Sequence, residues 1–529
     1  MAFALSKSVL PRLLPAYKCA RSIPTRPCTR PLHRSLLSRS ESAPYFSRTL
    51  ASLARGRTET FQIRPSGPQA EQEEAFRLSP LDLIVTQNYS TWALIFKLES
   101  ADTAAIAETF KRALAATLGQ CRHFVGTVEK GEGGSFSIVK KPDSTARFDV
   151  KWLDGPGDDF PSFAELERAK FSSQSLGDPG LLTIEGMSMA SKRPPGTSPE
   201  VSGFQLTFIP GGMIFNVHKH HAVCDVTGTT SLVHQIADHC YSIRHGTPPP
   251  AWDEAFMDRS RFIPPPVDPK DQVQPPPPPP RHPDWLPCSW LLFHLPQSRV
   301  AELKQLAAPG DGTQISTYDA LTAFLWRVMM RNRAQIYLPD LSLPAVFLES
   351  VNMRGRLTPK VSERYQGNLL CGGLSQLQEK QLTLGEVISE VPLPRLAAYI
   401  RQITAGVDAR TLEGFLAAMT PVADVSAMHS RLDIFPPMSL AVTDWRRATM
   451  CARDFGFGRP AAAKQIADVV YENMMMIYPQ RPAPEDSAAA ADQGLEVVIP
   501  FETHAVDLLI QDPDMQKYFE FVGYEAGAP

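Results

Sequence analysis

The distribution of apolar residues predicts two neighbouring strands followed by a helix in the first half of the chain. Residues 204–217 are rich in β-branched and aromatic residues on both sides of the turn sequence Pro210-Gly211-Gly212, which predicts a pair of short strands. Beyond Thr227, apolar residues recur every three to four positions, as in an amphipathic helix: Leu232, Val233, Ile236, Ala237 and Cys240. The segment in between is therefore a tight connection from strand to helix, where open α/β sheets carry functional residues.

The second half of the chain has the same mixture of patterns. Helical periodicity covers residues 298–307 and 318–330, and Ser298 is the expected N-cap of the first of these helices. Residues 345–351 and 439–443 have the composition of strands. Periodicity alone therefore predicts an α/β fold made of two units.

Length and composition are typical of a two-domain globular enzyme. The chain has 529 residues, of which 43% are hydrophobic and 21% charged. A net charge of −3 gives no reason to expect nucleic acid or an anionic membrane as a partner, and no stretch approaches the ~20 apolar residues that span a bilayer. The 8 cysteines form no CxxC pair, which favours reduced thiols in an intracellular, cytoplasmic protein.

Two segments differ in composition from the rest. Residues 1–60 form a basic leader rich in Ser and Arg, with eight Lys or Arg and no acidic residue among the first 40, which is typical of a disordered extension or a mitochondrial transit peptide. Residues 261–289 are rich in proline and include the run Pro275 to Pro280. Such a run favours extended polyproline II, so we expect a stiff tether between two domains; a ligand for an SH3-like domain is the alternative.

The connection after the second strand contains an imidazole and a carboxylate four residues apart, His221 and Asp225. A histidine at this place can act as a general base near neutral pH, and a nearby carboxylate can fix its loop or its ring. A single HxxxD match is a weak signal when taken alone, because two fixed positions recur by chance in long chains.

Several other histidines crowd the same region and raise the question of a metal site: His218, His220, His234 and His239. On a strand, His218 and His220 face one way and His221 the other. The chain has neither HExxH nor CxxC, so we expect no metal.

A second motif near the C-terminus strengthens the case for catalysis. The segment Asp454-Phe455-Gly456-Phe457-Gly458, taken with His221 and Asp225, resembles the two signatures of the BAHD acyltransferase family, HxxxDG and DFGWG, in their usual order. Further segments extend the resemblance over about residues 75–525: 78–82, which looks like the family's opening strand segment, 122–126, 318–327, 351–357 and 365–368. Within the family, the chain is most similar to the fungal branch of trichothecene 3-O-acetyltransferase-like enzymes that act on secondary metabolites.

The resemblance implies a fold and an activity. The implied fold is α/β, with two chloramphenicol-acetyltransferase-like subdomains, each a mixed sheet with flanking helices, and a channel between them. Residues 75–260 would form the first subdomain and 290–529 the second. The implied enzyme is a monomer without a permanently bound cofactor. It moves an acyl group, by default acetyl, from CoA to a hydroxyl or amine of a hydrophobic secondary metabolite.

The resemblance also assigns roles around the first motif. His221 would act as the general base, taking the proton of the acceptor and returning it to the departing CoA thiolate. Asp225 would point away from the acceptor and pair with an arginine, either Arg354 or Arg356. Asp225 would thus support the histidine loop without taking part in proton transfer.

Two further groups of residues receive roles by the same resemblance. Thr443 and Trp445 would donate hydrogen bonds to the oxyanion of the tetrahedral intermediate. Asp454, Gly456 and Gly458 would shape a loop on the CoA side, at a distance from the chemistry.

The chain departs from the family pattern at two positions. Val226 stands where the family usually has glycine after the aspartate, and Gly228 is then expected to supply the flexibility of the turn. Phe457 replaces the tryptophan of DFGWG and keeps an aromatic filler. Two alternatives stay open: a non-catalytic relative that binds small molecules, and a condensation-type enzyme with a carrier-bound acyl donor, which the pair His220-His221 superficially matches.

Overall fold

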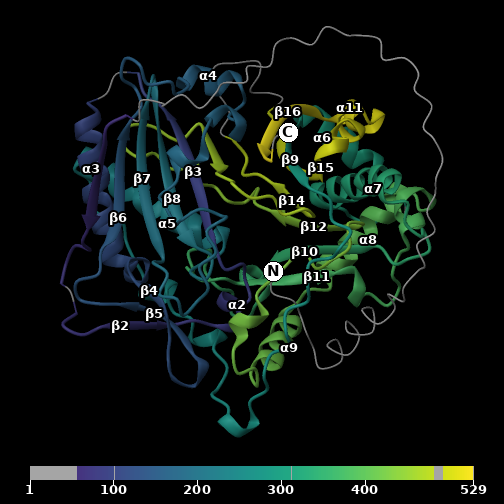
Figure 1. The fold of residues 1–529 in the computed structure, drawn as a ribbon, viewed down its shortest axis with the longest axis horizontal. Coiled ribbons are helices and arrows are strands. Elements are labelled where there is room, and N and C mark those ends of the chain that lie inside the picture. Colours follow the sequence, from purple (N-terminus) through teal and green to yellow (C-terminus); the bar gives the residue numbers. More distant parts are fainter. Residues whose placement is uncertain (1–55, 69, 100–101, 311, 482–492, 528–529) are drawn as a thin grey trace.

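The computed structural model describes residues 56–68, 70–99, 102–310, 312–481 and 493–527. Within these ranges the chain forms two α/β halves that lie side by side, each built around a mixed sheet with helices packed on it (Figure 1). The predicted fold class is thereby confirmed. The predicted leader lies outside the described residues as far as residue 55, so its targeting role stays a prediction.

The first sheet has six strands in the order β1-β6-β7-β8-β3-β13. Its strands are β1 (Thr58–Ile63), β6 (Ala146–Trp152), β7 (Ser202–Ile209), β8 (Gly212–His220), β3 (Tyr89–Lys97) and β13 (Ala462–Gln465). β6 and β7 pair in parallel and the other neighbours antiparallel, so the sheet is mixed. The prediction of two strands around Pro210-Gly211 is confirmed, since β7 ends at Ile209, β8 begins at Gly212 and Gly211 has a φ of 73°.

The second sheet has seven strands in the order β11-β10-β12-β14-β15-β9-β16. Its strands are β11 (Leu370–Leu374), β10 (Val346–Asn352), β12 (Ser439–Asp444), β14 (Met474–Ile477), β15 (Leu495–Glu502), β9 (Cys288–Leu295) and β16 (Glu520–Ala526). β12 pairs in parallel with both β10 and β14, whereas the outer pairs are antiparallel. The strands predicted at 345–351 and 439–443 correspond to β10 and β12.

Helices pack on both sheets, and a small three-stranded sheet lies beside the first one. The small sheet contains β2 (Glu74–Arg77), β5 (Phe136–Lys140) and β4 (Thr127–Lys130). The helices of the first half are α2 (Pro80–Leu83), α3 (Thr103–Gln120), α4 (Phe163–Arg168) and α5 (Val226–His245). Those of the second half are α6 (Gln297–Leu306), α7 (Thr317–Tyr337), α8 (Leu393–Ala405), α9 (Ala409–Met419), α10 (Val506–Ile510) and α11 (Pro513–Tyr518). α5 is the helix predicted after Thr227.

Two local predictions are wrong. Ser298 is not an N-cap, because α6 begins one residue earlier and Pro296 occupies the N-cap position. The segment 78–82 is not a strand. It contains the short helix α2, because the N–H and hydroxyl of Ser79 both donate to the Asp82 carboxylate, at 2.9 and 2.7 Å, and Pro80 fits the first helical position.

β13 comes from the second half of the sequence but completes the first sheet. Ala462 to Gln465 pair antiparallel with β3, and Ala461 N–H donates to the carbonyl of Ile95 at 2.7 Å. The chain then returns to the second sheet through β14. The division of the sequence at 260 and 290 stays a prediction, and this crossover means that the first half needs residues from both sides of it.

The proline-rich crossover, residues 261–289, is docked on the second half. Val273 N–H donates to the carbonyl of Pro421 at 2.7 Å, and Ala423 N–H donates back to Val273 at 2.9 Å. Arg431 also donates to the carbonyl of Pro279 at 2.9 Å. These contacts fix the tether along its length.

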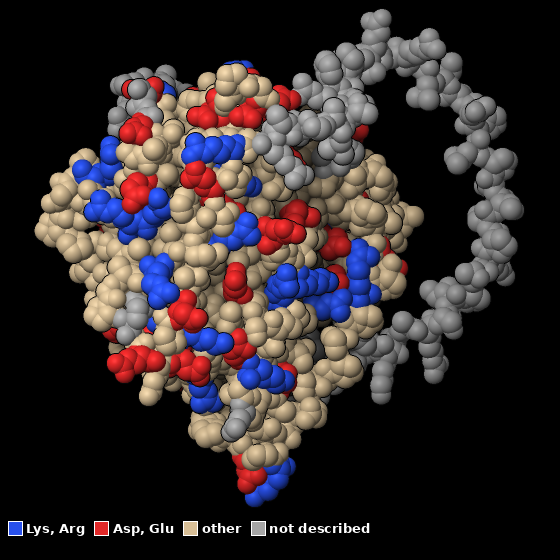
Figure 2. Space-filling view, turned by 60° about the vertical axis from the view of Figure 1, so that its left-hand side comes forward, with Lys and Arg blue, Asp and Glu red and all other residues tan. Residues whose placement is uncertain are grey.

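The surface carries charges of both signs. On the face shown in Figure 2, acidic and basic side chains are interspersed, in keeping with the net charge of −3. None of the helices in the described ranges has the length and apolar character that a bilayer span requires.

Candidate active site

His221 directly follows the last residue of β8 and lies in the connection before α5. Its N–H donates to the carbonyl of Asn88, just before β3, at 2.9 Å. Its carbonyl accepts from Nδ2 of Asn368 at 2.9 Å. The backbone of His221 is therefore held by segments from both halves of the chain.

The electrostatic surroundings of His221 favour the neutral imidazole. Nδ1 of the ring is buried and has no hydrogen-bond partner among the described residues. Burial of the ring, and after it the positive charge of Lys219, lower the pKa of His221 well below its ordinary value. The ring is therefore uncharged at neutral pH, which is the form that accepts a proton.

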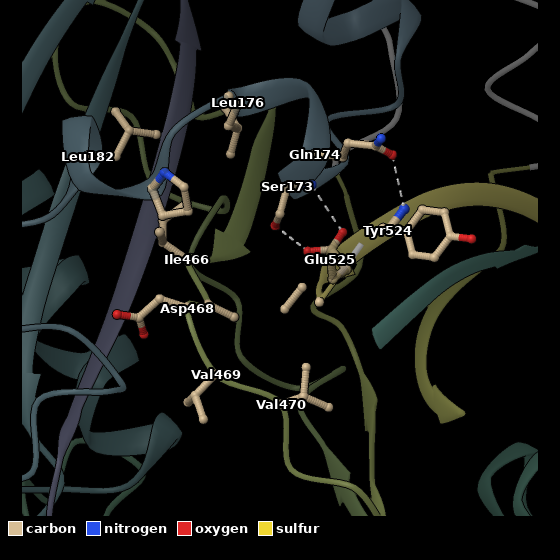
Figure 3. Close-up of a pocket in the computed structure, with 15 residues that line it drawn as sticks. Ser173, Gln174, Leu176, Leu182, Ile466, Asp468, Val469, Val470, Tyr524 and Glu525 are labelled. Carbon is tan, nitrogen blue, oxygen red and sulfur yellow. Dashed lines mark hydrogen bonds between the residues drawn. The ribbon is translucent and has the colours of Figure 1, made fainter. Parts of the chain in front are cut away.

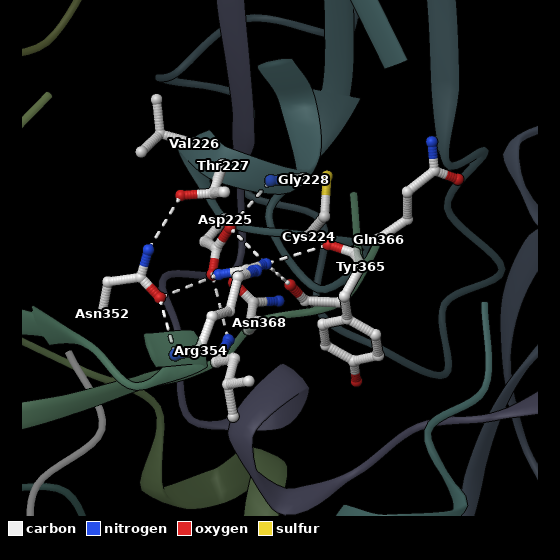
Figure 4. Close-up of polar contacts among 12 residues, drawn as sticks. Cys224, Asp225, Val226, Thr227, Gly228, Asn352, Arg354, Tyr365, Gln366 and Asn368 are labelled. Carbon is white, nitrogen blue, oxygen red and sulfur yellow. Dashed lines mark hydrogen bonds and ion pairs between the residues drawn. The ribbon is translucent and has the colours of Figure 1, made fainter. Parts of the chain in front are cut away.

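The carboxylate of Asp225 is engaged in an ion pair with Arg354 (Figure 4). Nη1 and Nη2 of Arg354 donate to Oδ2 and Oδ1 at 2.8 and 3.0 Å, and the two side chains are 0% and 1% exposed. The N–H groups of Gly228 and Leu369 complete the shell at 2.9 and 3.0 Å. Burial raises the pKa of Asp225, but Arg354 and these N–H groups outweigh it and hold the pKa below its usual value.

Arg354, and not Arg356, is the partner of Asp225. Arg354 also donates to the carbonyls of Tyr365 and Gly367, at 2.9 and 3.0 Å, so one guanidinium ties the HxxxD loop to the segment 365–367 (Figure 4). Arg356 instead donates to the carbonyls of Thr404 and Val407 at 2.8 and 2.6 Å.

A second buried carboxylate, that of Asp82, supports the same loop and was not among the functional residues predicted from the sequence. Oδ1 of Asp82 accepts from the N–H and Nδ2 of Asn368, at 2.9 and 3.1 Å. Arg259 lies 3.4 Å from Oδ2 of Asp82 and donates to the carbonyls of Val223 and Gln366 at 2.8 and 2.7 Å. The Ser79-x-x-Asp82 capping box is the one sequence signal that could have drawn attention to this aspartate.

The residues that follow Asp225 show why valine is tolerated after it. Asp225 is the N-cap of α5, so Val226 occupies the first helical position and needs no unusual backbone angle. Gly228 does not supply flexibility, because it lies within the first turn of α5. A Cβ at Gly228 would approach Cβ of Cys224 to 2.6 Å and Cα of Gln366 to 3.4 Å, so this glycine allows close packing.

Thr443 and Trp445 lie at the end of β12, in the interior of the second sheet. Trp445 N–H donates to the carbonyl of Ile477 at 2.9 Å, which continues the pairing of β12 with β14. The ring of Trp445 contacts the ring of Trp92 on β3 edge-on, with centroids 5.1 Å apart. Trp445 therefore lies between the two sheets, against β3, whose preceding residue Asn88 accepts a hydrogen bond from the His221 N–H.

The DFGFG segment is a tight loop closed by its own aspartate. Oδ1 of Asp454 accepts from the N–H groups of Gly456 and Gly458 at 2.7 and 3.1 Å. The two glycines have φ angles of 85° and 117°, which side chains with a Cβ rarely adopt. A Cβ at Gly456 would also meet Cβ of Arg244 at 2.8 Å.

The aromatic residues of this loop fill the core of the first half. Phe455 is 0% exposed and packs edge-on against Phe96 of β3 at 5.0 Å between centroids. Phe457, which replaces the family tryptophan, contacts Phe110 of α3 at 5.5 Å. The loop thus docks the second half of the sequence on the first sheet.

The remaining histidines around His221 have partners of their own. Nε2 of His218 accepts from the N–H of Ile184 at 2.9 Å, and Nε2 of His220 lies 2.7 Å from the carbonyl of Arg193. Burial lowers the pKa of His218 to about 3 and that of His220 to about 4. In the part of the chain that the structure describes, no group of three or more His, Cys, Asp or Glu could hold a metal ion.

A cavity of about 370 Å³ opens beside the interface of the two sheets (Figure 3). Its walls are largely apolar and include Leu176, Leu182, Ile466, Val469 and Val470. The carboxylate of Glu525 lies in its wall and accepts from Ser173 and from the hydroxyl of Tyr478, the latter at 3.2 Å. Val469 and Val470 pack in the same apolar cluster as Trp445, whereas His221, Thr443 and Trp445 are not among the residues that line the cavity.

Comparison with known proteins identifies the family. The model of the Transferase family matches residues 189–509, and that of the trichothecene 3-O-acetyltransferase-like N-terminal domain matches residues 88–240. Acetyltransferase FGR3 of Gibberella zeae is 40% identical over 474 residues, which cover 88% of this chain and 94% of that protein. Trichothecene 3-O-acetyltransferase TRI101 of Fusarium sporotrichioides is 23% identical over 419 residues, covering 75% of this chain and 84% of that protein.

A solved structure of the TRI101 enzyme also has a similar fold. The crystal structure of Fusarium sporotrichioides TRI101 complexed with coenzyme A and T-2 superposes with a TM-score of 0.67 at 21% identity. The match covers 85% of this chain and 100% of that one. The chain therefore belongs to the Transferase family, as a member of the BAHD-type, CoA-dependent acyltransferases and of their trichothecene 3-O-acetyltransferase-like branch.

Proposed function

We propose that this protein transfers an acyl group, by default acetyl, from CoA to a hydroxyl or amine of a hydrophobic secondary metabolite, with His221 as the general base. The single observation that carries the role of His221 is the division of labour in the HxxxD loop. The imidazole is neutral and its backbone is held by Asn88 and Asn368, whereas the Asp225 carboxylate is fully engaged with Arg354.

The proposed reaction needs no covalent enzyme intermediate. His221 removes the proton of the acceptor hydroxyl as the oxygen attacks the thioester carbonyl, which forms a C–O bond and a tetrahedral oxyanion. When this intermediate collapses, the C–S bond breaks and the imidazolium returns its proton to the CoA thiolate. Because both oxygens of Asp225 already accept hydrogen bonds from Arg354, Asp225 acts only by fixing the loop.

We assign the stabilisation of the oxyanion to hydrogen bonds from the hydroxyl of Thr443 and the indole N–H of Trp445. The position of Trp445 between the sheets, in contact with Trp92, supports this assignment. The loss of one such donor typically reduces the rate by 10²–10³.

The acceptor is proposed to place its apolar body in the cavity next to the interface. Its walls of leucine, isoleucine and valine suit a hydrophobic metabolite, and its volume of about 370 Å³ suits a small molecule. Acetyl as the acyl group is supported by the names of two relatives, an acetyltransferase and a 3-O-acetyltransferase.

The test is acceptor-dependent release of free thiol from acetyl-CoA, measured with a panel of hydroxylated terpenoids and alkaloids. Wild-type protein is compared with His221→Ala, and product formation is followed by mass spectrometry. Thiol release that requires an acceptor and disappears in the variant supports the proposal. The loss should reach about 10²–10⁴-fold, the usual contribution of general-base catalysis.

Each other outcome excludes part of the proposal. Turnover that survives in His221→Ala excludes this residue as the base. Coenzyme A binding without turnover of any acceptor or acyl donor in the panel excludes the proposed acceptor class. An absence of coenzyme A binding favours a non-catalytic relative.

A further inference from the structure

A buried lysine lies two residues before the proposed base. Lys219 is on β8 and is 2% exposed. It faces the same side of the strand as Phe215 and Val217, which belong to the apolar core of the first half. A lysine in such surroundings is rare, because a charged group loses its hydration when it is buried.

The ammonium of Lys219 holds the connection that carries His221. Nζ donates to the carbonyl of Cys224, the residue just before Asp225. The preceding carbonyl, that of Val223, accepts from Arg259 at 2.8 Å. Two buried cations therefore bind successive carbonyls of the short segment between His221 and Asp225.

The two cations differ in how their charges are balanced. Arg259 lies 3.4 Å from the carboxylate of Asp82. For Lys219, no carboxylate comes within 4.0 Å among the described residues, and Asp225 is already paired with Arg354. The ammonium of Lys219 thus lacks a carboxylate partner at ion-pair distance among the described residues, and burial lowers the pKa of Lys219, against the opposing effects of Cys224 and Asp225.

The remaining titratable and charged groups that face this connection come from each element packed against it. They are His220 on β8, Cys224 and Asp225 at the start of α5, Asp82 on α2, Arg259 and Arg354 on the two supporting segments, and Tyr471 beside Asn88. His220 is neutral and the two carboxylates have arginine partners, and after burial Lys219 is the largest influence that lowers the pKa of His221.

We propose that Lys219 is a positioning residue of the acyltransferase. Its hydrogen bond to the Cys224 carbonyl holds the segment between His221 and Asp225, and its positive charge lies near the base. This inference rests on the proposed role of His221. The hydrogen bond sets the geometry of the loop, and the charge opposes protonation of the imidazole in the resting enzyme. The base then stays available at lower pH than it would without the lysine.

Three substitutions separate the hydrogen bond from the charge. Lys219→Met removes both, Lys219→Gln removes the charge and keeps an N–H donor, and Lys219→Arg keeps both. Lys140→Met is the matched control, because Lys140 is 1% exposed and is paired with Glu74 at 2.9 Å, on β5 away from the site.

Two readouts are measured on the full chain at a series of pH values. The first is the titration of the His221 ring by NMR in histidine-labelled protein, assigned with His221→Gln. The second is kcat and KM for thiol release from acetyl-CoA, with the acceptor that turns over best and with water alone. In Lys219→Met and Lys219→Gln, the His221 titration and the acidic limb of kcat/KM should both move to higher pH.

The size of the effect should follow the geometry. In Lys219→Met, kcat should fall on the order of 10- to 100-fold with little change in KM for acetyl-CoA, because a small misplacement of the base affects the chemical step. Lys219→Gln should lose less, and Lys219→Arg should keep the titration of the wild type. Lys140→Met should leave both pH profiles unchanged.

The inference is overturned if Lys219→Met or Lys219→Gln titrates like the wild type and keeps its pH profile. It is equally overturned if Lys140→Met shifts the His221 titration as much as they do. Lys219→Gln decides the question if the Met variant does not fold. A failure of the proposed function is recognised separately, because then His221→Gln keeps full thiol release while the NMR comparison of the lysine variants is still valid.

Discussion

At the scale of single residues, the loop of the proposed base depends on one guanidinium. Arg354 contacts Asp225 with two nitrogens and two backbone carbonyls of the segment 365–367 with one of them. A planar fork of donors can satisfy this set at once, whereas an ammonium cannot. The identity of this residue, and not only its charge, should therefore matter.

The first prediction compares the two arginines that the sequence left as alternatives. Arg354→Lys should lower the free energy of unfolding by about 2 kcal/mol or more and kcat on the order of tenfold, because the bidentate pair and the carbonyl contacts are lost. Arg356→Lys should cost less than about 1 kcal/mol, since Arg356 contacts only exposed and half-buried carbonyls. Urea unfolding and steady-state kinetics measure both. Equal effects in the two variants would contradict the pairing.

The second prediction concerns a buried carboxyl in the second half, Glu349 on β10. Oε2 accepts from the hydroxyl of Tyr318 at 2.5 Å, whereas Oε1 has no partner among the described residues. Burial raises the pKa of Glu349 to about 7. Because the folded pKa lies above the unfolded one, the folded state binds more protons between these values, and stability falls as pH rises from about 4.3 to 7.

We expect the loss to be about 3 kcal/mol, because the two pKa values differ by roughly 2.5 units and each unit corresponds to about 1.4 kcal/mol. Glu349→Gln should remove this part of the pH dependence and be more stable than the wild type at pH 8. Unfolding curves at pH 5 and pH 8 measure it, with the exposed Glu302→Gln as the control. If the difference in the free energy of unfolding between pH 5 and pH 8 is the same in Glu349→Gln as in the wild type, the carboxyl of Glu349 is already ionised at pH 5.

At the scale of elements, the DFGFG loop can pack against the first half only because two glycines give it a tight backbone turn. Gly456 and Gly458 both have positive φ, but only Gly456 is also pressed against a neighbour, the side chain of Arg244 on α5. The third prediction is that Gly456→Ala destabilises the protein by about 2–4 kcal/mol and Gly458→Ala by about 1–2 kcal/mol. Chemical denaturation of the two variants checks the order, which the opposite ranking would refute.

At the scale of the whole molecule, the halves are interleaved and not simply joined. β13 closes the edge of the first sheet beside β3, and Phe455 lies in the core with Phe96. The fourth prediction is that a fragment of residues 56–260 does not fold, because it lacks both features, whereas residues 56–527 unfold in a single transition. The chemical-shift dispersion in a ¹H–¹⁵N NMR spectrum shows whether the fragment folds, and chemical denaturation shows whether residues 56–527 unfold in one transition. A well-dispersed spectrum of the fragment would contradict the prediction.

The sequence by itself determined the features that depend on neighbouring residues. The turn at 210–211, the helix after Thr227 and the placement of His221 between strand and helix follow from side-chain periodicity and turn chemistry, which act over a few residues. The spacing of the two motifs gave the family, and with it the two-subdomain fold and the expected activity. Each of these signals is contained in a short stretch of chain.

Only the tertiary structure decided which distant groups meet. Arg354 and Arg356 are equally plausible partners of Asp225 in the sequence, and the choice depends on where the segments at 225 and 354 are brought together. The same is true of Asp82, of the partner of Lys219 and of β13, which joins a sheet whose other strands lie hundreds of residues away. The physical reason is that a buried charge or an open sheet edge needs a partner, but any compatible group that the fold brings near can be that partner.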